Sequence, residues 1–382
     1  MKTFTKTTTK VTLTLLLCLV SSIVFAEKRD KSNDSNKEFK YTKNKSIDKD
    51  FDARSYYNLN LYGIYSDYKI VRCNDDKISI RVEITTKSNR EKDAEEMLNN
   101  INIEINDSKK SETIEAKTVI KNKKMYNINF QIEYYISIPK NMFLTIDNSY
   151  GKIKIDKLNK GIVLDLKYGE LTIDSLLSNN NIIDISYSDA KIKYVNWING
   201  ELKYSDIRIN DGNNIDLNMK YCNAKFGDVK KLTATCEYSE VNCNNIDYAN
   251  MNIRYTDTYF DKVKEVAIEN SYSDVEIDYL IKKITFNSTY GDIEINKLDK
   301  DFKRIDIKSK YSDVDLILSE DNVFTYYVSS EYGQIDCKYL KEHARVYIYE
   351  LNKEKMGGNI NDNEEQNIWI EVKYGDVEID IN

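Results

Sequence analysis

Residues 373–380 read KYGDVEID, and similar phrases recur upstream: NSYGKIKID begins at Asn148, LKYGELTID at Leu166 and STYGDIEIN at Ser288. Each copy contains a tyrosine, and successive tyrosines lie 17 to 21 residues apart except for a final step of 42. A period of this length is typical of a stacked repeat architecture. The anchor tyrosines are Tyr150, Tyr168, Tyr187, Tyr204, Tyr221, Tyr238, Tyr255, Tyr272, Tyr290, Tyr311, Tyr332 and Tyr374.

Two irregular places interrupt this series. We interpret the step of 42 as two coils, one of which has lost its tyrosine and contains the insertion KEKMGGNINDNEE. Tyr65, in YSDYKIV, is interpreted as an earlier copy that a long insertion separates from the others.

Apolar residues alternate on both sides of the anchor and change phase at it. With the tyrosine as position 0, positions +3 and +5 are mostly apolar, as in Ile153 and Ile155 after Tyr150. Positions −6, −4 and −2 are also commonly apolar, as in Leu166 before Tyr168. Because strand side chains alternate between two faces, this phase change predicts a corner at the tyrosine. Position +1 is always small, as a tight stacked bend requires: Gly151, Gly169, Ser188, Ser205, Cys222, Ser239, Thr256, Ser273, Gly291, Ser312, Gly333 and Gly375.

A single coil is not stable alone. Burying five or six apolar side chains contributes roughly 8–15 kcal/mol, whereas ordering about 17 backbone residues costs on the order of 17–34 kcal/mol. Stacked coils share one core and hydrogen-bond along the stack. The sequence therefore predicts an all-β fold, a single-stranded β-helix (β-solenoid) with 17–21 residues per coil. About twelve or thirteen coils at ~4.8 Å each give a rod on the order of 60 Å long.

The N-terminus has the organisation of a secretory signal peptide. Three lysines precede the apolar stretch VTLTLLLCLVSSIVFA, and Val24 and Ala26 occupy the −3 and −1 positions, so cleavage is predicted after residue 26. A retained membrane anchor is the alternative, but the stretch is short and contains Ser and Thr. Lipid modification is not expected at Cys18, because small residues do not precede it. Export is therefore predicted, to the periplasm, the cell envelope or the medium, with no further membrane span.

Three regions follow the signal peptide 1–26. Residues 27–50 are nearly all polar and are predicted to be a disordered leader. Residues 51–148 contain alternating segments typical of strands and are predicted to form an N-terminal β cap region. Residues 149–382 hold the tyrosine-anchored repeats.

One helix is expected within the cap region. SNREKDAEEMLNNI begins with Ser88 and Glu91 at the spacing of a capping box. Its apolar residues fall on one face, so a helix over 89–101 is predicted to cover the end of a sheet. The residues of that face are Ala94, Met97, Leu98 and Ile101.

Charge and cysteine content exclude several kinds of site. The net charge of −7 becomes −10 once the three leader lysines are removed, so nucleic acid and anionic lipid are not predicted as partners. Five cysteines remain after cleavage, without a CxxC motif or a His/Cys cluster, and we predict neither a metal site nor another cofactor. Cys236 and Cys243 flank the same corner, so a bridge between them is the alternative to two buried thiols.

The repeated [KS]-Y-[GS]-D-[IV]-x-I, the helix-bearing N-terminal segment and the junction YYISIPKNMFLTIDNSYG together resemble the bacterial putative-adhesin family. The resemblance spans about residues 51–382. It implies an adhesin-head-like, right-handed β-helix in or outside the cell envelope, in a family of largely unknown function. It provides no catalytic motif to transfer to this sequence.

The tyrosine column is the first candidate site. Stacked aromatic rings could offer a platform for sugar rings, which bind aromatic faces. The structural alternative, which we favour, is a corner residue that covers the core while its hydroxyl reaches water. The candidate ligand column comprises Tyr187, Tyr204, Tyr221, Tyr238, Tyr255 and Tyr272.

Position +2 carries a row of carboxylates that could hold calcium between coils. The glycine-rich nonapeptide of calcium-binding β-rolls is absent, and Asp beside a tight turn commonly bonds nearby backbone groups instead. We therefore favour the structural role. The row comprises Glu170, Asp189, Asp206, Glu240, Asp257, Asp274, Asp292, Asp313 and Asp376.

Position +4 changes from basic to acidic along the predicted rod. Two molecules could therefore self-associate antiparallel along this face with opposite charges meeting, although an ordinary solvated face is favoured, because surface ion pairs contribute little. The residues are Lys154, Lys191, Arg208, Lys225, Glu276, Glu294, Asp315, Asp336 and Glu378.

No residue pattern predicts catalysis. The single histidine, His343, has no nucleophile at a related spacing, and carboxylate pairs occur throughout the repeat. The leading hypothesis is an exported, non-catalytic structural or adhesin-like surface protein whose partner is a glycan or a protein. A carbohydrate-binding module using the tyrosine column is the alternative, and a polysaccharide-processing enzyme comes third.

Overall fold

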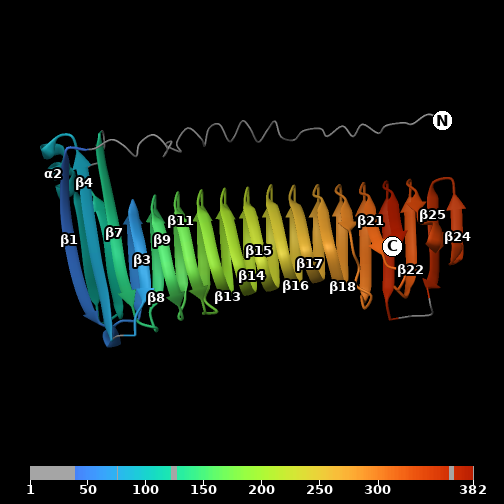
Figure 1. Ribbon diagram of the computed structural model, residues 1–382, viewed down its shortest axis with the longest axis horizontal. Coiled ribbons are helices and arrows are strands. Elements are labelled where there is room, and N and C mark those ends of the chain that lie inside the picture. The colour runs from blue at the N-terminus through green and yellow to red at the C-terminus, as the bar shows by residue number, and fades with distance from the viewer. Residues whose placement is uncertain (1–38, 75, 122–126, 361–364, 382) are drawn as a thin grey trace.

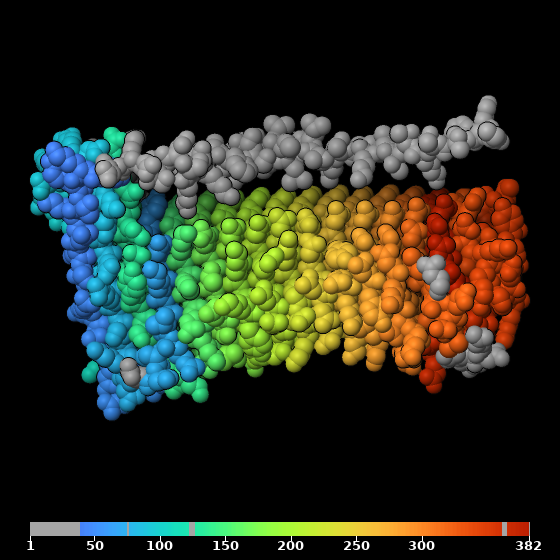
Figure 2. Space-filling model, viewed as in Figure 1, coloured from blue at the N-terminus to red at the C-terminus, as the bar shows by residue number. Residues whose placement is uncertain are grey.

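The tyrosine repeats form stacked coils with two sheets running along a straight rod (Figures 1 and 2). The computed structural model describes residues 39–74, 76–121, 127–360 and 365–381. The predicted signal peptide and its cleavage site lie outside the described residues. No helix within the described ranges is long and apolar enough to cross a membrane.

The post-tyrosine sheet contains the strands that follow each corner. From the N-terminal end its order is β1 (Tyr41–Asp52), β4 (Lys77–Ser88), β7 (Ile128–Ile138), β3 (Ser66–Arg72), β9 (Lys152–Leu158), β11 (Glu170–Leu176), the first parts of β13 to β18, β19 (Ile293–Ile295), β21 (Val314–Leu318), β27 (Val377–Ile381) and β23 (Ile335–Asp336).

The pre-tyrosine sheet contains the strands that lead into each corner. Its order is β5 (Ile101–Ser108), β6 (Thr113–Ile120), β2 (Asn58–Ile64), β8 (Phe143–Ser149), β10 (Ile162–Lys167), β12 (Asn181–Ser186), the second parts of β13 to β18, β20 (Arg304–Lys310), β26 (Asn367–Lys373), β22 (Phe324–Glu331), β25 (Lys353–Ile360) and β24 (Ala344–Glu350).

In the central coils one long strand bends through both sheets. These strands are β13 (Asp189–Lys203), β14 (Asp206–Lys220), β15 (Asn223–Glu237), β16 (Glu240–Arg254), β17 (Asp257–Ser271) and β18 (Val275–Thr289). Along β14, Ile207 and Ile209 are buried after the corner, and Leu217 and Met219 are buried before the next one. The predicted change of phase at the tyrosine is therefore confirmed, and the buried side chains form one continuous core along the rod.

The first coil, formed by β2 and β3, stacks on a coil that is distant from it in the sequence. β2 and β3 pair with β8 and β9, and Tyr65 stacks on Tyr150 with ring centroids 5.0 Å apart. The interpretation of Tyr65 as an earlier copy is confirmed. The chain between β3 and β8 leaves the stack to build the N-terminal end.

The helix α2 (Glu91–Asn100) lies against β4 and β1 at that end. It buries Ala94 and Met97, as predicted. The predicted capping box is wrong. The N-cap residue is Arg90, whose side chain makes no capping hydrogen bond, and Ser88 still belongs to β4. The Ser88 hydroxyl accepts a bond from the Arg90 N–H instead, because β4 extends to the start of the helix.

The expectation of a disordered leader up to residue 50 is wrong for its second part. β1 pairs antiparallel with β4 along all of its twelve residues. Only Ile47 and Phe51 are apolar and packed against the core, so the strand depends on its backbone pairing. Its alternating lysines and acidic residues suit the outermost strand of a sheet. The first part of the leader lies outside the described residues.

The C-terminal coil is not where sequence order predicts it. β26 and β27 lie between the coil of Tyr311 and the coil of Tyr332, and Figure 1 marks the C-terminus there. The step of 42 residues therefore contains no extra coil, and that interpretation is wrong. It contains α3 (Lys338–Glu342) and the antiparallel hairpin of β24 and β25, which extend the C-terminal end.

Candidate functional site

Thirteen tyrosines form one continuous column along the corner. Successive ring centroids are 4.8–5.1 Å apart and the rings are within 4–19° of parallel. All six residues of the predicted ligand column belong to it. In stacking order the column is Tyr65, Tyr150, Tyr168, Tyr187, Tyr204, Tyr221, Tyr238, Tyr255, Tyr272, Tyr290, Tyr311, Tyr374 and Tyr332.

Every column tyrosine has a left-handed backbone, with φ between 50° and 63°. A left-handed residue reverses the alternation of a strand, which explains the change of phase in the sequence. This conformation costs roughly 1–2 kcal/mol for a residue other than glycine. The stacked ring faces offset that cost, because aromatic pairs contribute about 0.5–1.5 kcal/mol beyond the area they bury.

The column presents ring edges to solvent, not ring faces. Eleven of its side chains are 38–49% exposed, while each ring face inside the column is covered by the next ring. Sugar rings bind to aromatic faces, so the column does not offer the platform considered from the sequence. Basic residues at position −1 also lie over several rings; the Arg254 guanidinium is 5.3 Å from the centroid of Tyr255 and the Lys310 Nζ is 5.1 Å from that of Tyr311.

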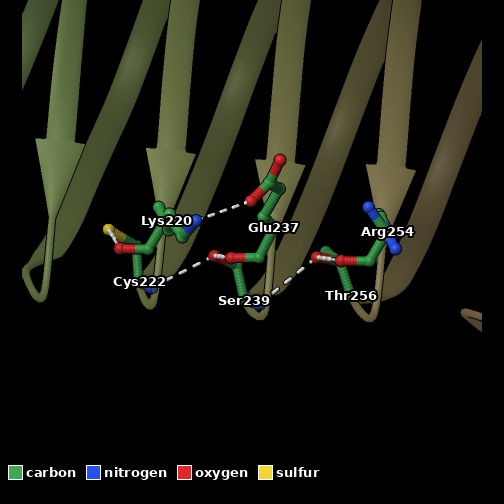
Figure 3. Close-up of polar contacts among 6 residues, drawn as sticks. All are labelled: Lys220, Cys222, Glu237, Ser239, Arg254 and Thr256. Carbon is green, nitrogen blue, oxygen red and sulfur yellow. Dashed lines mark hydrogen bonds and ion pairs between the residues drawn. The ribbon is translucent and has the colours of Figure 1, made fainter.

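A ladder of hydrogen bonds lies beneath the column at position +1 (Figure 3). The Ser239 hydroxyl accepts a bond from the Cys222 N–H at 3.1 Å and donates one to the Glu237 carbonyl at 2.9 Å. In turn the Ser239 N–H donates to the Thr256 hydroxyl at 3.2 Å. The ladder explains why small hydroxyl residues predominate at this position in the central coils.

Glycine is required at some corners because the next coil approaches too closely for a side chain. A Cβ on Gly375 would overlap the carbonyl oxygen of Ser312, and a Cβ on Gly333 would overlap that of Gly375. The predicted restriction of position +1 to small residues therefore has a direct steric cause.

In the C-terminal coils the carboxylates at position +2 bond to the backbone of the adjacent coil. Asp274 accepts from the Asp292 N–H at 2.9 Å, and Asp292 accepts from the Asp313 N–H at 2.7 Å. Asp376 accepts from the Gln334 N–H at 2.8 Å, across the inverted C-terminal order. Within the described residues, no group of three or more His, Cys, Asp or Glu side chains is arranged to hold a metal ion. For these C-terminal members of the row, the bonds are the structural role expected from the sequence.

The residues at position +4 form one row in register along the post-tyrosine sheet. Lys69 joins the basic end, and Glu378 lies between Asp315 and Asp336 at the acidic end. Partial burial, followed by the charges of Glu378 and Glu294, raises the pKa of Asp315 to about 6. The full order is Lys69, Lys154, Thr172, Lys191, Arg208, Lys225, Asn242, Tyr259, Glu276, Glu294, Asp315, Glu378 and Asp336.

The acidic row at +2 lies beside this row on the same face. Two copies stacked antiparallel would match opposite charges at +4, but they would also bring the two +2 rows together. Like charges opposed across an interface cost free energy. Self-association along this face therefore stays a prediction, and the +2 row works against it.

The remaining candidates from the sequence, two cysteines and the histidine, have neighbours that suit a structural role. Cys236 and Cys243 are buried free thiols, and burial raises the pKa of Cys236 to about 12. His343 follows α3, and its ring packs on Tyr339 with centroids 4.3 Å apart. Sequence analysis did not single out Ser288 and Ser309, which occupy the inward position −2 where half of the twelve anchored repeats have a large apolar residue. Serine in place of a large apolar residue at these two positions is the sequence signal that could have indicated a groove near the C-terminal end.

No curated protein matches this chain. Similar solved structures include a "putative cell adhesion protein" from Clostridium sporogenes (13% identity, TM-score 0.20), which aligns with 89% of this chain and 100% of its own. A "putative adhesin" from Parabacteroides merdae (11%, TM-score 0.30) aligns with 89% of this chain and 96% of its own. A "putative lipid binding protein" from Parabacteroides distasonis (14%, TM-score 0.29) aligns with 72% and 94%.

A family assignment comes from the sequence of the repeats themselves. The match covers residues 64–380, from the first coil to the inserted C-terminal coil. The chain therefore belongs to the family described as Toastrack DUF4097.

Proposed function

We propose that the protein is an exported, non-catalytic β-solenoid that acts as a structural or adhesive element at the cell surface or in the envelope. The observation that carries the proposal is the register of the coils, which continues along the rod with one shift between Val263 and Glu265, where β17 pairs with β18. Side chains of one kind repeat every 4.8–5.1 Å along the rod, which suits a rigid spacer with long, regular contact surfaces.

The tyrosine column has a structural role in this proposal. Its ring faces stack on one another, and its backbone bonds link every coil to the next; for example, the Tyr221 N–H donates to the Glu237 carbonyl at 3.0 Å. A rod held in this way at each layer resists bending and local opening. Carbohydrate binding through the exposed ring edges remains the second candidate, and the exposed hydroxyls are the observation in its favour.

The export part is tested in a bacterial host that produces the full chain with a C-terminal tag. The expected result is a shortened protein in the envelope or medium that protease removes from intact cells. A matched control, Leu16→Arg, places a charge in the apolar stretch of the signal peptide and is expected to leave the full-length chain inside. Cytosolic accumulation of the unchanged chain would contradict the proposal.

The adhesive part is tested by coating surfaces with the purified exported protein. Increased attachment of cells or of surface glycans, compared with a coating of equal mass of an unrelated rod, supports an adhesive role. Unchanged attachment, together with a weakened envelope when the protein is absent, supports a purely structural role.

A further inference from the structure

A groove lies on the pre-tyrosine sheet near the C-terminal end. It has a volume of about 380 Å³ and is formed by residues of β18, β20, β26 and β22, with inward residues at position −2 below and outward residues around them, and with Lys353 of β25 beside Glu331 at its border. The groove exists only because β26 is inserted between β20 and β22. Its residues therefore come from segments that are separated in the sequence.

The charge of the groove is opposite to that of its surroundings. Residues 255–382 contain 16 Lys and Arg against 28 Asp and Glu, whereas residues 39–254 contain 33 against 31. Within this acidic part of the chain, the groove gathers more lysines than carboxylates. A local reversal of charge in a concave place favours an anionic ligand. The charged residues of the groove are Lys308, Lys310, Lys353, Lys373, Glu331 and Glu371.

The floor of the groove contains an unsatisfied polar group. Ser309 is 93% buried, because only 7% of its surface is exposed, and its hydroxyl has no hydrogen-bond partner. Ser288 and Ser309 line the groove at the inward position −2, where Leu202 and Ile253 fill the core in central coils. These small residues hollow the surface, and a buried hydroxyl without a partner costs free energy until a ligand or water bonds to it.

An aromatic pair borders the groove. Tyr327, which lines it, stacks on Trp369 with ring centroids 4.3 Å apart and an angle of 26°. Trp369 points outward from β26 and is 43% exposed. Exposed aromatic rings beside hydrogen-bonding groups are a common means of binding sugar rings, and here they lie in a different place from the tyrosine column.

We propose that this groove binds a carboxylated polysaccharide, with the lysines bonding to uronate groups and the Tyr327–Trp369 pair contacting a sugar ring. The inference rests on the proposed surface role, because it names the ligand class of an adhesive contact and places that contact at the C-terminal end of the rod.

The test is a titration of the purified exported protein with three probes: polygalacturonate, neutral dextran and polyglutamate. The expected result is binding to polygalacturonate, no binding to dextran, and at least tenfold weaker binding to polyglutamate, which has carboxylates but no sugar. Equal affinity for polyglutamate would overturn the sugar assignment. No binding to polygalacturonate would overturn the whole inference.

Variants locate the binding on the molecule. The double variant Lys308→Ala/Lys310→Ala removes two outward lysines and is expected to weaken binding to polygalacturonate at least tenfold. Ser309→Val fills the hollow with an apolar group, as Val372 does on the neighbouring strand, and is expected to abolish binding while preserving the thermal unfolding midpoint. The control Lys203→Ala/Lys220→Ala removes two lysines outside the groove at position −1, the position of Lys310, and is expected to leave binding within twofold of the unchanged protein.

The outcomes separate this inference from the proposed function. Equal weakening by the groove variant and the control would show a diffuse contact and refute the groove. A protein that reaches the cell surface but binds none of the probes leaves the surface role intact. A protein that binds polygalacturonate but stays in the cytosol leaves the groove intact and refutes the surface role.

Discussion

Replacing Ser239 by alanine tests the hydrogen-bond ladder beneath the tyrosine column. The change removes the acceptor of the Cys222 N–H and the donor to the Glu237 carbonyl. The Glu237 carbonyl keeps its bond from the Tyr221 N–H, so that loss is small. The Cys222 N–H keeps no acceptor in a buried corner, which costs about 1–3 kcal/mol. We therefore expect the free energy of unfolding to fall by about 1–3 kcal/mol.

The assay is urea denaturation followed by circular dichroism, with the midpoint compared at an unchanged slope. Two variants serve as controls. Ser239→Thr keeps a hydroxyl, as Thr256 does in the next coil, and Ser271→Ala removes a serine side chain at position −1 outside the ladder. Both are expected to change stability by less than about 0.5 kcal/mol. An equally small loss for Ser239→Ala would refute the claim that the ladder stabilises the corners.

Three further predictions concern other parts of the rod. Gly375→Ala is expected to lower the thermal unfolding midpoint by several degrees because its Cβ would overlap a backbone carbonyl, whereas Gly357→Ala, with 3.4 Å to its nearest neighbour, is expected to have little effect. The raised pKa of Asp315, about 6, means that the folded protein binds this proton more tightly than the unfolded chain, so stability falls as the pH rises from about 4 to 6. Asp315→Asn is therefore expected to stabilise the protein at pH 7 by up to about 1 kcal/mol after allowance for solvent screening, and hardly at pH 4, in unfolding measured at both values; an equal gain at both would contradict this. Burial raises the pKa of Cys236 to about 12, so a thiol reagent followed by mass mapping is expected to modify the partly exposed Cys73 first; equal rates would show that the corner opens.

The coil and its core could be predicted because the alternation of apolar residues in each repeat follows directly from the two buried strand faces. Inward positions −2 and +3 are apolar in most coils, and small residues at +1 mark the tight corner. The left-handed conformation of the tyrosines follows from the same change of phase, although tyrosine itself gives no sign of it, since such backbones favour glycine or asparagine.

The order of the coils could not be predicted in the same way. Every copy has nearly the same stacking surface, so the sequence does not say whether Tyr374 follows Tyr332 or lies between Tyr311 and Tyr332. The groove depends on this inversion, because Lys310 and Lys373 become neighbours only through it. β1 was missed for a different reason: it buries little apolar surface, and its stability comes from backbone pairing that composition does not reveal.

The central claim is that the coils form one continuous rod, and small-angle X-ray scattering of the purified exported protein tests it most directly. A compact domain of this size has a radius of gyration of about 20 Å, whereas the stacked strands predict a rod roughly 75–80 Å long at ~4.8 Å per strand. We expect a radius of gyration clearly above the compact value and the pair-distance distribution of a rod with constant cross-section. A symmetric distribution near 20 Å would contradict the account.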